Sequence, residues 1–317
     1  MYIGIITPAP PGSHYGNRVT AIRWSKILRK LGHRVAIRES YLDEPFDLLV
    51  ALHARRSFES TKSFHSEHPE SPIIVALTGT DVYRDLKRNK KAQRSLDIAT
   101  RIVVLQPRAL DELSNGWRNK TRVVYQSVSL RSTQKRSPKS SWFEVCVVGH
   151  LRPVKDPFRA AMAARLLSQS SRIRVTNVGA AMTRRERDIA QRELNLNPRF
   201  KWLGEVPPSR VREILSRSRL FVISSKMEGG ANALGEAIVA GVPVLASRIP
   251  GSIGILGDDY PGYFEVGDTA GLARLMLQCE TNPQFLSKLT KRCLELIPLF
   301  DPDREQDSWA RLVDELM

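Results

Sequence analysis

The feature that most constrains this chain is a regular alternation of short apolar runs with amphipathic helical segments along its whole length. In the first part, the apolar runs predict strands at Ile3–Thr7, Val35–Ile37, Leu48–Leu52, Ile73–Leu77, Ile102–Leu105 and Val123–Tyr125. A second series predicts strands at Phe143–Val148, Arg174–Val178, Phe200–Leu203, Leu220–Ile223, Val242–Ala246 and Gly262–Val266. Strands that are apolar along their length suit a parallel sheet covered by helices on both faces. The pattern therefore predicts an α/β fold.

The segments between these strands have the period of amphipathic helices. The first helix is expected to start from Asn17 as its N-cap and to end where Gly32 occupies the C′ position. Its apolar face is expected to carry Val19, Ile22, Ile27, Leu28 and Leu31. Other helices are predicted over Pro157–Leu167, Arg184–Leu194 and Arg304–Leu316.

The chain has 317 residues, more than a single hydrophobic core usually serves, so two domains are expected. The segment 131–141 carries no apolar residue and is the expected linker. We therefore expect a first Rossmann-like domain over 1–130 and a second over 142–300. Residues 301–317 form a terminal helix expected to pack back toward the first domain. Two such domains would face each other across a cleft, with ligands beyond the carboxyl ends of the strands.

The formal net charge of +16 is the unusual feature of the composition. Nucleic acid, an anionic membrane surface or an anionic small substrate would each explain it. The basic residues are scattered, and aromatic residues make up only 7% of the chain, so no basic stripe interleaved with stacking side chains is present. The composition therefore disfavours nucleic acid as a partner.

The cysteine count and the apolar runs bear on location. The three cysteines, Cys146, Cys279 and Cys293, have no metal-ligand spacing and suit a reducing cytosol. The opening Tyr2–Ile6 is too short for a signal sequence, and no apolar run reaches the roughly 18 residues of a membrane span. We expect a cytoplasmic protein with no metal and no stable membrane association.

The segment from Ser224 to Ser247 is the most informative part of the second half. A strand ends at Ile223, a loop with two glycines follows, and a helix begins near Ala231. Glycines allow close backbone approach, and the first N–H groups of a helix attract a diphosphate. Carboxylates accept hydrogen bonds from vicinal hydroxyls, which suits a ribose and a hexose. The candidate donor-binding residues here are Glu228, Gly229, Gly230, Ala231, Asn232, Ala233, Leu234 and Glu236.

The spacing of Glu228 and Glu236, followed by Gly241-x-Pro243-Val, resembles the retaining GT-B glycosyltransferases of family four. So does the segment Val148–Asp156, where that family has a Gly-x-Leu-x-x-x-Lys motif. The resemblance implies the GT-B fold, with Arg152 and Lys155 stabilising a leaving nucleoside diphosphate without a metal and Glu228 in the catalytic set. Gly149 and Gly204 would lie in donor-site loops. The alternative is that Arg152 and Lys155 are solvated cations of a basic protein.

The first half presents three polar segments at strand ends, Thr7–Asn17, His53–Ser57 and Thr78–Asp81. His53 is either a general base or a hydrogen-bonded structural residue, and Asp81 either meets the substrate or caps the following segment. Arg55 and Arg56 are alternatively solvated. The candidate acceptor-binding residues are Thr7, Gly16, Asn17, His53, Arg55, Thr78, Thr80 and Asp81.

These first-half segments, TPAPPGSHYGNRVTAIRW, LLVALHARRS and VALTGTDVYRDL, resemble the selenosugar synthases of selenoneine biosynthesis. The resemblance runs nearly the full length. It implies displacement of UDP from UDP-N-acetylglucosamine or UDP-glucose by selenophosphate, which forms a carbon–selenium bond. It also implies contact with other enzymes of that pathway, no cofactor, and little need for a general base, since the selenium nucleophile is already anionic.

The sequence leaves two other functions open. A transferase of the same fold could glycosylate a lipid or polysaccharide at a membrane surface, although no basic amphipathic helix with exposed aromatics is evident. A binding protein on an inactive transferase fold is disfavoured because Arg152, Lys155, Glu228 and Glu236 are all present.

Overall fold

The computed structural model describes residues 1–129 and 141–317, which fall into two compact units. The first unit comprises Met1–Ser127, Glu228–Gly230 and Phe300–Met317, and the second comprises Val128–Met227 and Ala231–Leu299. The expected linker at 131–141 lies outside the described residues except for its last residue.

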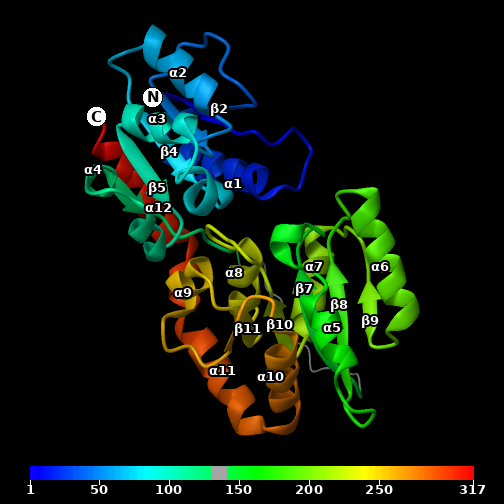
Figure 1. The fold of residues 1–317 in the computed structure, drawn as a ribbon. Coiled ribbons are helices and arrows are strands. Elements are labelled where there is room, and N and C mark those ends of the chain that lie inside the picture. The colour runs from blue at the N-terminus through cyan, green and yellow to red at the C-terminus, as the bar shows by residue number, and fades with distance from the viewer. Residues whose placement is uncertain (130–140) are drawn as a thin grey trace. The chain divides into compact units, whose positions relative to one another are not determined.

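The first unit is built on a six-stranded parallel sheet of order β2-β1-β3-β4-β5-β6 in its described residues (Figure 1). Its strands are β1 (Tyr2–Ile6), β2 (Arg34–Arg38), β3 (Leu48–Leu52), β4 (Ile73–Leu77), β5 (Arg101–Val104) and β6 (Thr121–Val123). Alternate residues of each strand belong to two separate cores. Helices α2 (Phe58–Glu67) and α3 (Lys90–Ile98) cover one core, and α1 (Gly16–Lys30) and α12 (Pro302–Asp314) cover the other. The sheet is therefore buried on both faces, as its apolar strands predict.

The second unit has a parallel sheet of order β12-β11-β10-β7-β8-β9 in its described residues. Its strands are β7 (Phe143–Val148), β8 (Ile173–Val178), β9 (Phe200–Trp202), β10 (Leu220–Ile223), β11 (Val244–Ser247) and β12 (Tyr263–Phe264). Its helices are α5 (Arg159–Arg165), α6 (Arg184–Leu196), α7 (Pro208–Arg217), α8 (Asn232–Val239), α9 (Pro250–Leu256), α10 (Thr269–Thr281) and α11 (Pro283–Glu295). Every predicted strand overlaps an observed one, so the prediction of two Rossmann-like α/β halves is confirmed.

Short elements complete the described chain. They are η1 (Asp81–Asp85), η2 (Pro107–Glu112), α4 (Asn115–Asn119), η3 (Pro153–Lys155) and η4 (Ile297–Phe300). Across residues 1–129 and 141–317, no helix combines the length and apolar character needed to cross a bilayer.

Helix α1 differs from its prediction at its start. The helix begins at Gly16 with Tyr15 in the N-cap position, so Asn17 lies inside the first turn and its predicted capping role is wrong. The predicted end is confirmed. Gly32 has a φ of +91°, and the N–H groups of Gly32 and His33 donate to the carbonyls of Arg29 and Leu28. This pair of hydrogen bonds is the Schellman arrangement.

The predicted apolar face of α1 is also partly wrong. The buried residues are Thr20, Ala21, Trp24, Ser25 and Leu28, whereas Val19 and Ile22 are 40% and 39% exposed. The face is set by packing against α12, where the rings of Trp24 and Trp309 meet edge-on with centroids 4.8 Å apart. The helical period of the sequence alone does not reveal this distant partner.

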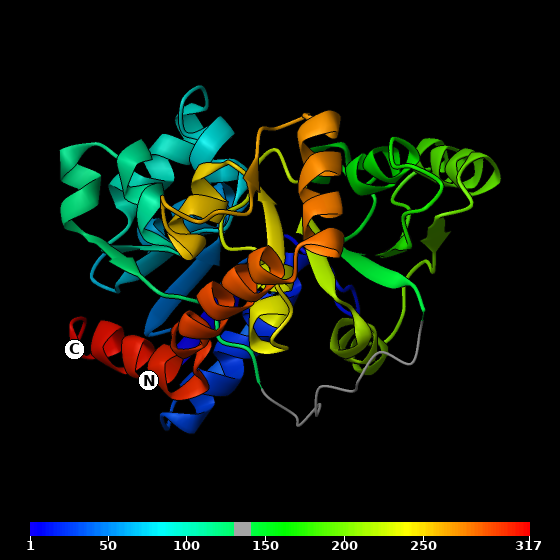
Figure 2. The same ribbon diagram turned by 90° about the horizontal axis from the view of Figure 1, so that it is seen from below.

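Helix α12 lies beside α1 (Figure 2), and a buried carboxylate joins it to the rest of the first unit. Glu305 is 1% exposed, and its Oε1 accepts a hydrogen bond of 2.8 Å from Trp24 Nε1. Its Oε2 accepts from the backbone N–H and the hydroxyl of Ser127, at 2.7 and 2.5 Å. Arg23 Nε lies 3.9 Å from the same oxygen. The side chain of Glu305 therefore links α12 both to α1 and to Ser127.

Replacing Glu305 with Ala should destabilise the first unit because it leaves the buried donors of Trp24 and Ser127 without their acceptor. A buried polar group that loses its partner costs about 1–3 kcal/mol, so we expect a loss of about 3 kcal/mol in the free energy of unfolding. Urea unfolding followed by tryptophan fluorescence measures this loss. Asp307→Ala, an exposed acid on the same helix, is the control and should change stability little. Equal stability of the two variants would contradict the role given to Glu305.

Candidate active site

The order of strands in the first sheet identifies where ligands bind in folds of this type. Strand β1 lies between β2 and β3, so the order of the sheet reverses between β1 and β3. Loops at the carboxyl ends of strands beside such a reversal form the ligand crevice of open α/β sheets. Thr7 follows β1, His53 follows β3 and Thr78 follows β4, so three of the predicted acceptor residues lie at this edge.

Asp81 ties two of these loops together. Its side chain is fully buried, and its oxygens accept hydrogen bonds from the N–H groups of Ala54, Thr78 and Gly79 at 3.1, 3.1 and 2.8 Å. Asp81 therefore fixes the loop after β3 relative to the loop after β4.

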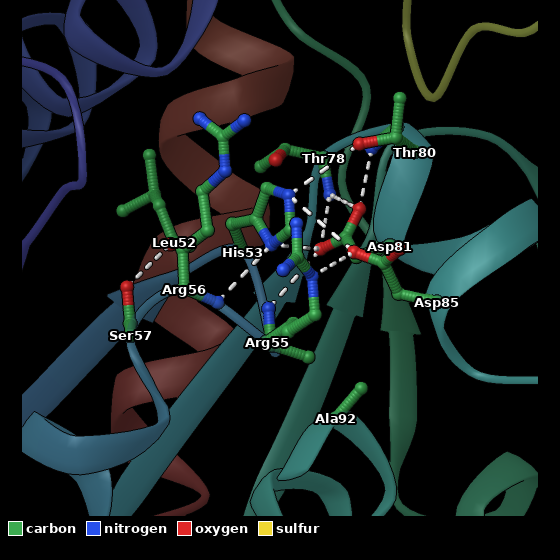
Figure 3. A network of polar contacts seen from close by, with 12 residues as sticks. Leu52, His53, Arg55, Arg56, Ser57, Thr78, Thr80, Asp81, Asp85 and Ala92 are labelled. Atoms are coloured by element: carbon green, nitrogen blue, oxygen red, sulfur yellow. Dashed lines mark hydrogen bonds and ion pairs between the residues drawn. The ribbon is translucent and has the colours of Figure 1, made fainter. Parts of the chain in front are cut away.

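His53 is buried, at 4% exposure, and lies between two carboxylates (Figure 3). Its Nδ1 accepts a hydrogen bond of 3.4 Å from the N–H of Arg56 and lies 3.9 Å from Asp81 Oδ2. Its Nε2 lies 3.4 Å from the hydroxyl of Thr80 and 3.9 Å from Asp85 Oδ2. Since Nδ1 accepts, the proton of the neutral ring is on Nε2, facing Thr80 and Asp85.

The surroundings of His53 keep its ring neutral. Burial lowers the pKa of His53 most strongly, and the charges of Arg56 and Arg55 lower it further. The charges of Asp81 and Asp85 oppose this, but the pKa remains below its ordinary value. The backbone of His53 has a φ of +75°, a left-handed conformation that is uncommon for residues other than glycine and is often found at functional sites.

Asp85 is a member of this cluster that the sequence analysis missed. Its Oδ2 accepts from Arg55 Nε at 2.7 Å, and its Oδ1 accepts from Arg84 Nε at 3.1 Å. Burial raises the pKa of Asp85, but these two hydrogen bonds outweigh that effect and leave the pKa lowered. The signal in the sequence was the spacing of Asp81 and Asp85, which places both carboxylates on the same side of one helical turn.

The remaining acceptor candidates lie near β1 and α1. Thr7 is fully buried, and its hydroxyl has no hydrogen-bond partner among the described residues. Gly16 and Asn17 are in the first turn of α1, where Gly16 is exposed and Asn17 half-buried. Thr7, His53, Arg55 and Thr78 thus lie in segments that follow strands of this sheet, Thr80 and Asp81 begin η1, and Gly16 and Asn17 begin α1.

In the second unit, the strand order reverses between β7 and β10. The loops after these strands hold Arg152, Lys155 and the segment that leads to α8. Two hydrogen bonds join the loops, from the N–H of Lys226 to the carbonyl of Val154 at 2.8 Å and from the hydroxyl of Ser224 to the carbonyl of Asp156 at 2.8 Å. Arg152 is exposed and Lys155 half-buried at this edge.

Glycines bring three strand ends close together at the same edge. The N–H of Gly149 donates to the carbonyl of Val178 at 2.8 Å, and the N–H of Gly179 donates to that of Gly204 at 2.7 Å. A Cβ at Gly179 would lie 2.1 Å from the carbonyl oxygen of Gly149, and Gly179 has a φ of +148°. Gly179 therefore has to be glycine, a requirement that the sequence analysis did not recognise.

The predicted donor motif is divided between the units. Glu228, which is buried, belongs with Gly229 and Gly230 to the first unit. Ala231 is the N-cap of α8 in the second unit, and Glu236 lies half-buried in the second turn of that helix. Of the other predicted residues in α8, Asn232 and Ala233 are half-buried and Leu234 is buried.

The two Rossmann-like α/β units carry polar loops at the carboxyl ends of their strands, where open sheets of this kind bind ligands. The model of the family "Glycosyl transferases group 1" matches residues 131–295, more than half of the chain. The chain therefore belongs to this glycosyltransferase family.

Relatives agree with this assignment. The chain is 23% identical over 277 residues to "Glycosyltransferase 1 domain-containing protein 1" of Xenopus tropicalis, covering 77% of this chain and 78% of the relative. Among solved structures, the Anabaena protein HepE, in complex with UDP and glucose, has a TM-score of 0.78 at 15% identity over 100% of both chains. Sucrose-phosphate synthase of Thermosynechococcus elongatus has a TM-score of 0.79 at 16% identity, covering 99% of this chain and 98% of that one. Both structural neighbours share the fold.

Replacing His53 with Asn should make the protein less sensitive to acid. In the unfolded chain a histidine binds a proton near pH 6.5, whereas folded His53 binds it only at lower pH. As the pH falls through about 6.5, the unfolded state therefore gains protons first and stability is lost. Asn removes this loss, and it tolerates the left-handed backbone better than other residues.

Melting temperatures of wild type and His53→Asn between pH 7.5 and 5 test this expectation. As the pH falls, the melting temperature of wild type should decrease more than that of His53→Asn. His65→Asn, at an exposed position on α2, is the control and should follow the wild-type curve. If the curve of His53→Asn also runs parallel to that of wild type, His53 does not carry the pH effect.

Proposed function

We propose that this protein transfers a hexosyl group from a UDP-sugar to selenophosphate and thereby forms a carbon–selenium bond. The observation that carries the donor half is the position of the loops after β7 and β10. They lie at the carboxyl ends of the two strands between which the order of the second sheet reverses, within the part of the chain that matches the transferase family. The UDP bound by the Anabaena neighbour supports a uridine nucleotide as the donor group.

The roles of the donor residues follow from their chemistry. Arg152 offers a planar fork and Lys155 a compact charge for the diphosphate, and the start of α8 adds backbone N–H groups. Glu236 accepts hydrogen bonds from the ribose hydroxyls, and Glu228 accepts them from the hexose. Gly149 and Gly204 allow the loops to approach the nucleotide closely. On this proposal no metal is needed, because the two cations neutralise the leaving group.

The acceptor half rests on the first-unit loops and on their resemblance to selenosugar synthases. The selenium atom attacks the anomeric carbon, the C1–Se bond forms as the C1–O bond breaks, and the electron pair leaves with the β-phosphate of UDP. The phosphoryl group stays on selenium until water hydrolyses the P–Se bond to give the selenosugar and phosphate. Because the nucleophile is already anionic, His53 orients the acceptor and no general base is required.

Replacing Glu236 with Ala should weaken UDP binding about tenfold or more. A hydrogen bond to a charged group contributes about 1.5–3 kcal/mol, and 1.4 kcal/mol corresponds to a factor of ten in affinity. Calorimetric titration with UDP measures the change. Glu295→Ala, at an exposed position on α11, is the matched control. Unchanged UDP affinity in Glu236→Ala would remove Glu236 from the donor site.

Replacing Arg152 or Lys155 with Ala should reduce kcat by about a hundredfold, with a smaller effect on donor binding. Negative charge on the leaving oxygen grows in the transition state, so a cation stabilises that state more than the bound substrate. Arg172→Ala, at the opposite end of β8, is the control. Wild-type turnover should persist in EDTA. Full activity of both variants, or complete loss of wild-type activity in EDTA, would exclude this mechanism.

The acceptor is identified by a competition between nucleophiles. The protein is incubated anaerobically, under reducing conditions, with UDP-N-acetylglucosamine or UDP-glucose and an equimolar mixture of selenophosphate, a polyprenyl phosphate in detergent and a free hexose. Mass spectrometry should find the selenium isotope pattern in the sugar product. Efficient transfer to the lipid or hexose with no selenium-bearing product would overturn the acceptor proposal and favour a transferase of membrane or polysaccharide acceptors.

A further inference from the structure

The charges around His53 do not cancel. The cluster contains three guanidinium groups, those of Arg55, Arg56 and Arg84, and two carboxylates, those of Asp81 and Asp85 (Figure 3). With a neutral imidazole at the centre, one positive charge is left over. The hydrogen bonds show which residue carries it.

Two of the three arginines are occupied. Arg55 donates to Asp85 Oδ2 at 2.7 Å and Arg84 donates to Asp85 Oδ1 at 3.1 Å, so a single carboxylate holds both. The Asp81 oxygens accept from three backbone N–H groups of the loops after β3 and β4, and among the described residues no arginine forms an ion pair with Asp81.

Arg56 is the remaining cation. Its backbone N–H donates to His53 Nδ1, which fixes the start of the side chain next to the ring. The side chain is exposed, and within residues 1–129 and 141–317 its guanidinium forms no ion pair with a carboxylate. Figure 3 shows this guanidinium pointing away from both aspartates, whereas that of Arg55 turns toward them.

We propose that Arg56 binds the oxyanion of the acceptor and that Arg55 is a positioning residue that holds the loop through Asp85. The sequence alone favours Arg55 as the arginine that binds the acceptor, whereas these contacts favour Arg56. An unpaired guanidinium offers its full charge and a planar pair of donors to a phosphate-type anion. A guanidinium already paired with a carboxylate has much of its charge compensated. The hydroxyl of Thr80, 3.4 Å from His53 Nε2, lies at the same cluster and supplies a further donor.

This inference rests on the proposed function, because it assigns the group that recognises the acceptor. It also narrows the chemical class of acceptor to a small multiply charged oxyanion. A neutral hydroxyl acceptor would gain much less from an uncompensated guanidinium than an anion does. The affinity for the acceptor should therefore fall with ionic strength, since an exposed charge is screened by salt.

The test measures binding of thiophosphate, a stable analogue of the same charge, by phosphorus NMR titration in the presence of UDP. Arg56→Ala should weaken binding about tenfold. Arg56→Lys should recover part of the loss, since it keeps the charge but not the planar fork. Arg94→Ala, an exposed arginine on α3, is the charge-matched control and should bind as wild type does. Binding by Arg56→Ala that equals wild type overturns the inference.

Turnover separates this inference from the proposed function. In Arg56→Ala the KM for selenophosphate should rise about tenfold, while kcat changes little and UDP affinity not at all. If wild type binds thiophosphate through Arg56 but makes no selenosugar, the proposed acceptor is wrong and the anion site stands. If Arg56→Ala makes selenosugar with the KM of wild type, the function stands and the role of Arg56 is wrong. A larger loss of thiophosphate binding in Arg55→Lys than in Arg56→Ala would assign the anion to Arg55 instead.

Discussion

Parallel hydrogen bonding between strands is the constraint on which the rest of this molecule depends. Because every neighbouring pair in both sheets is parallel, all the carboxyl ends of a sheet lie at one edge. Loops that are far apart in the sequence then become neighbours there. The strand order reverses between β1 and β3 and between β7 and β10, and in open α/β folds ligands bind beyond the carboxyl ends of the strands at such reversals.

Buried carboxylates fix those loops. Asp81 joins the loops after β3 and β4, Asp85 holds two arginines, and Glu305 ties α12 and Ser127 to α1. The side chains of these three acids are all bonded to groups of the protein itself. The chain has only 33 acidic residues against 49 basic ones. The excess positive charge is therefore left at positions such as Arg56 and Arg152, which are exposed at the edges where ligands are expected.

The sequence predicted the strands well because most are apolar runs bounded by turn residues, as at Leu48–Leu52 and Ile73–Leu77. The end of α1 was also predictable, since Gly32 adopts a conformation that other residues avoid. These features depend on local chemistry alone.

What the sequence did not predict depends on partners that are distant in the chain. The buried face of α1 follows Trp24 because Trp309 packs on it from the last helix. The pairing of Arg55, and not Arg56, with a carboxylate depends on Asp85, about thirty residues away in the chain. Composition and spacing identify such residues as candidates, but only their hydrogen bonds assign their roles.

On our proposal, this transferase joins the hexosyl group of a UDP-sugar to a selenium nucleophile carried by phosphorus. Phosphorus NMR of one anaerobic reaction, with the purified protein, UDP-N-acetylglucosamine or UDP-glucose and selenophosphate, follows donor, acceptor and products together. We expect the UDP signals to grow as the selenophosphate signal falls, in equal amounts, and UDP to stay absent without selenophosphate. Loss of the UDP-sugar with the selenophosphate signal unchanged, or no reaction with either donor, would contradict it.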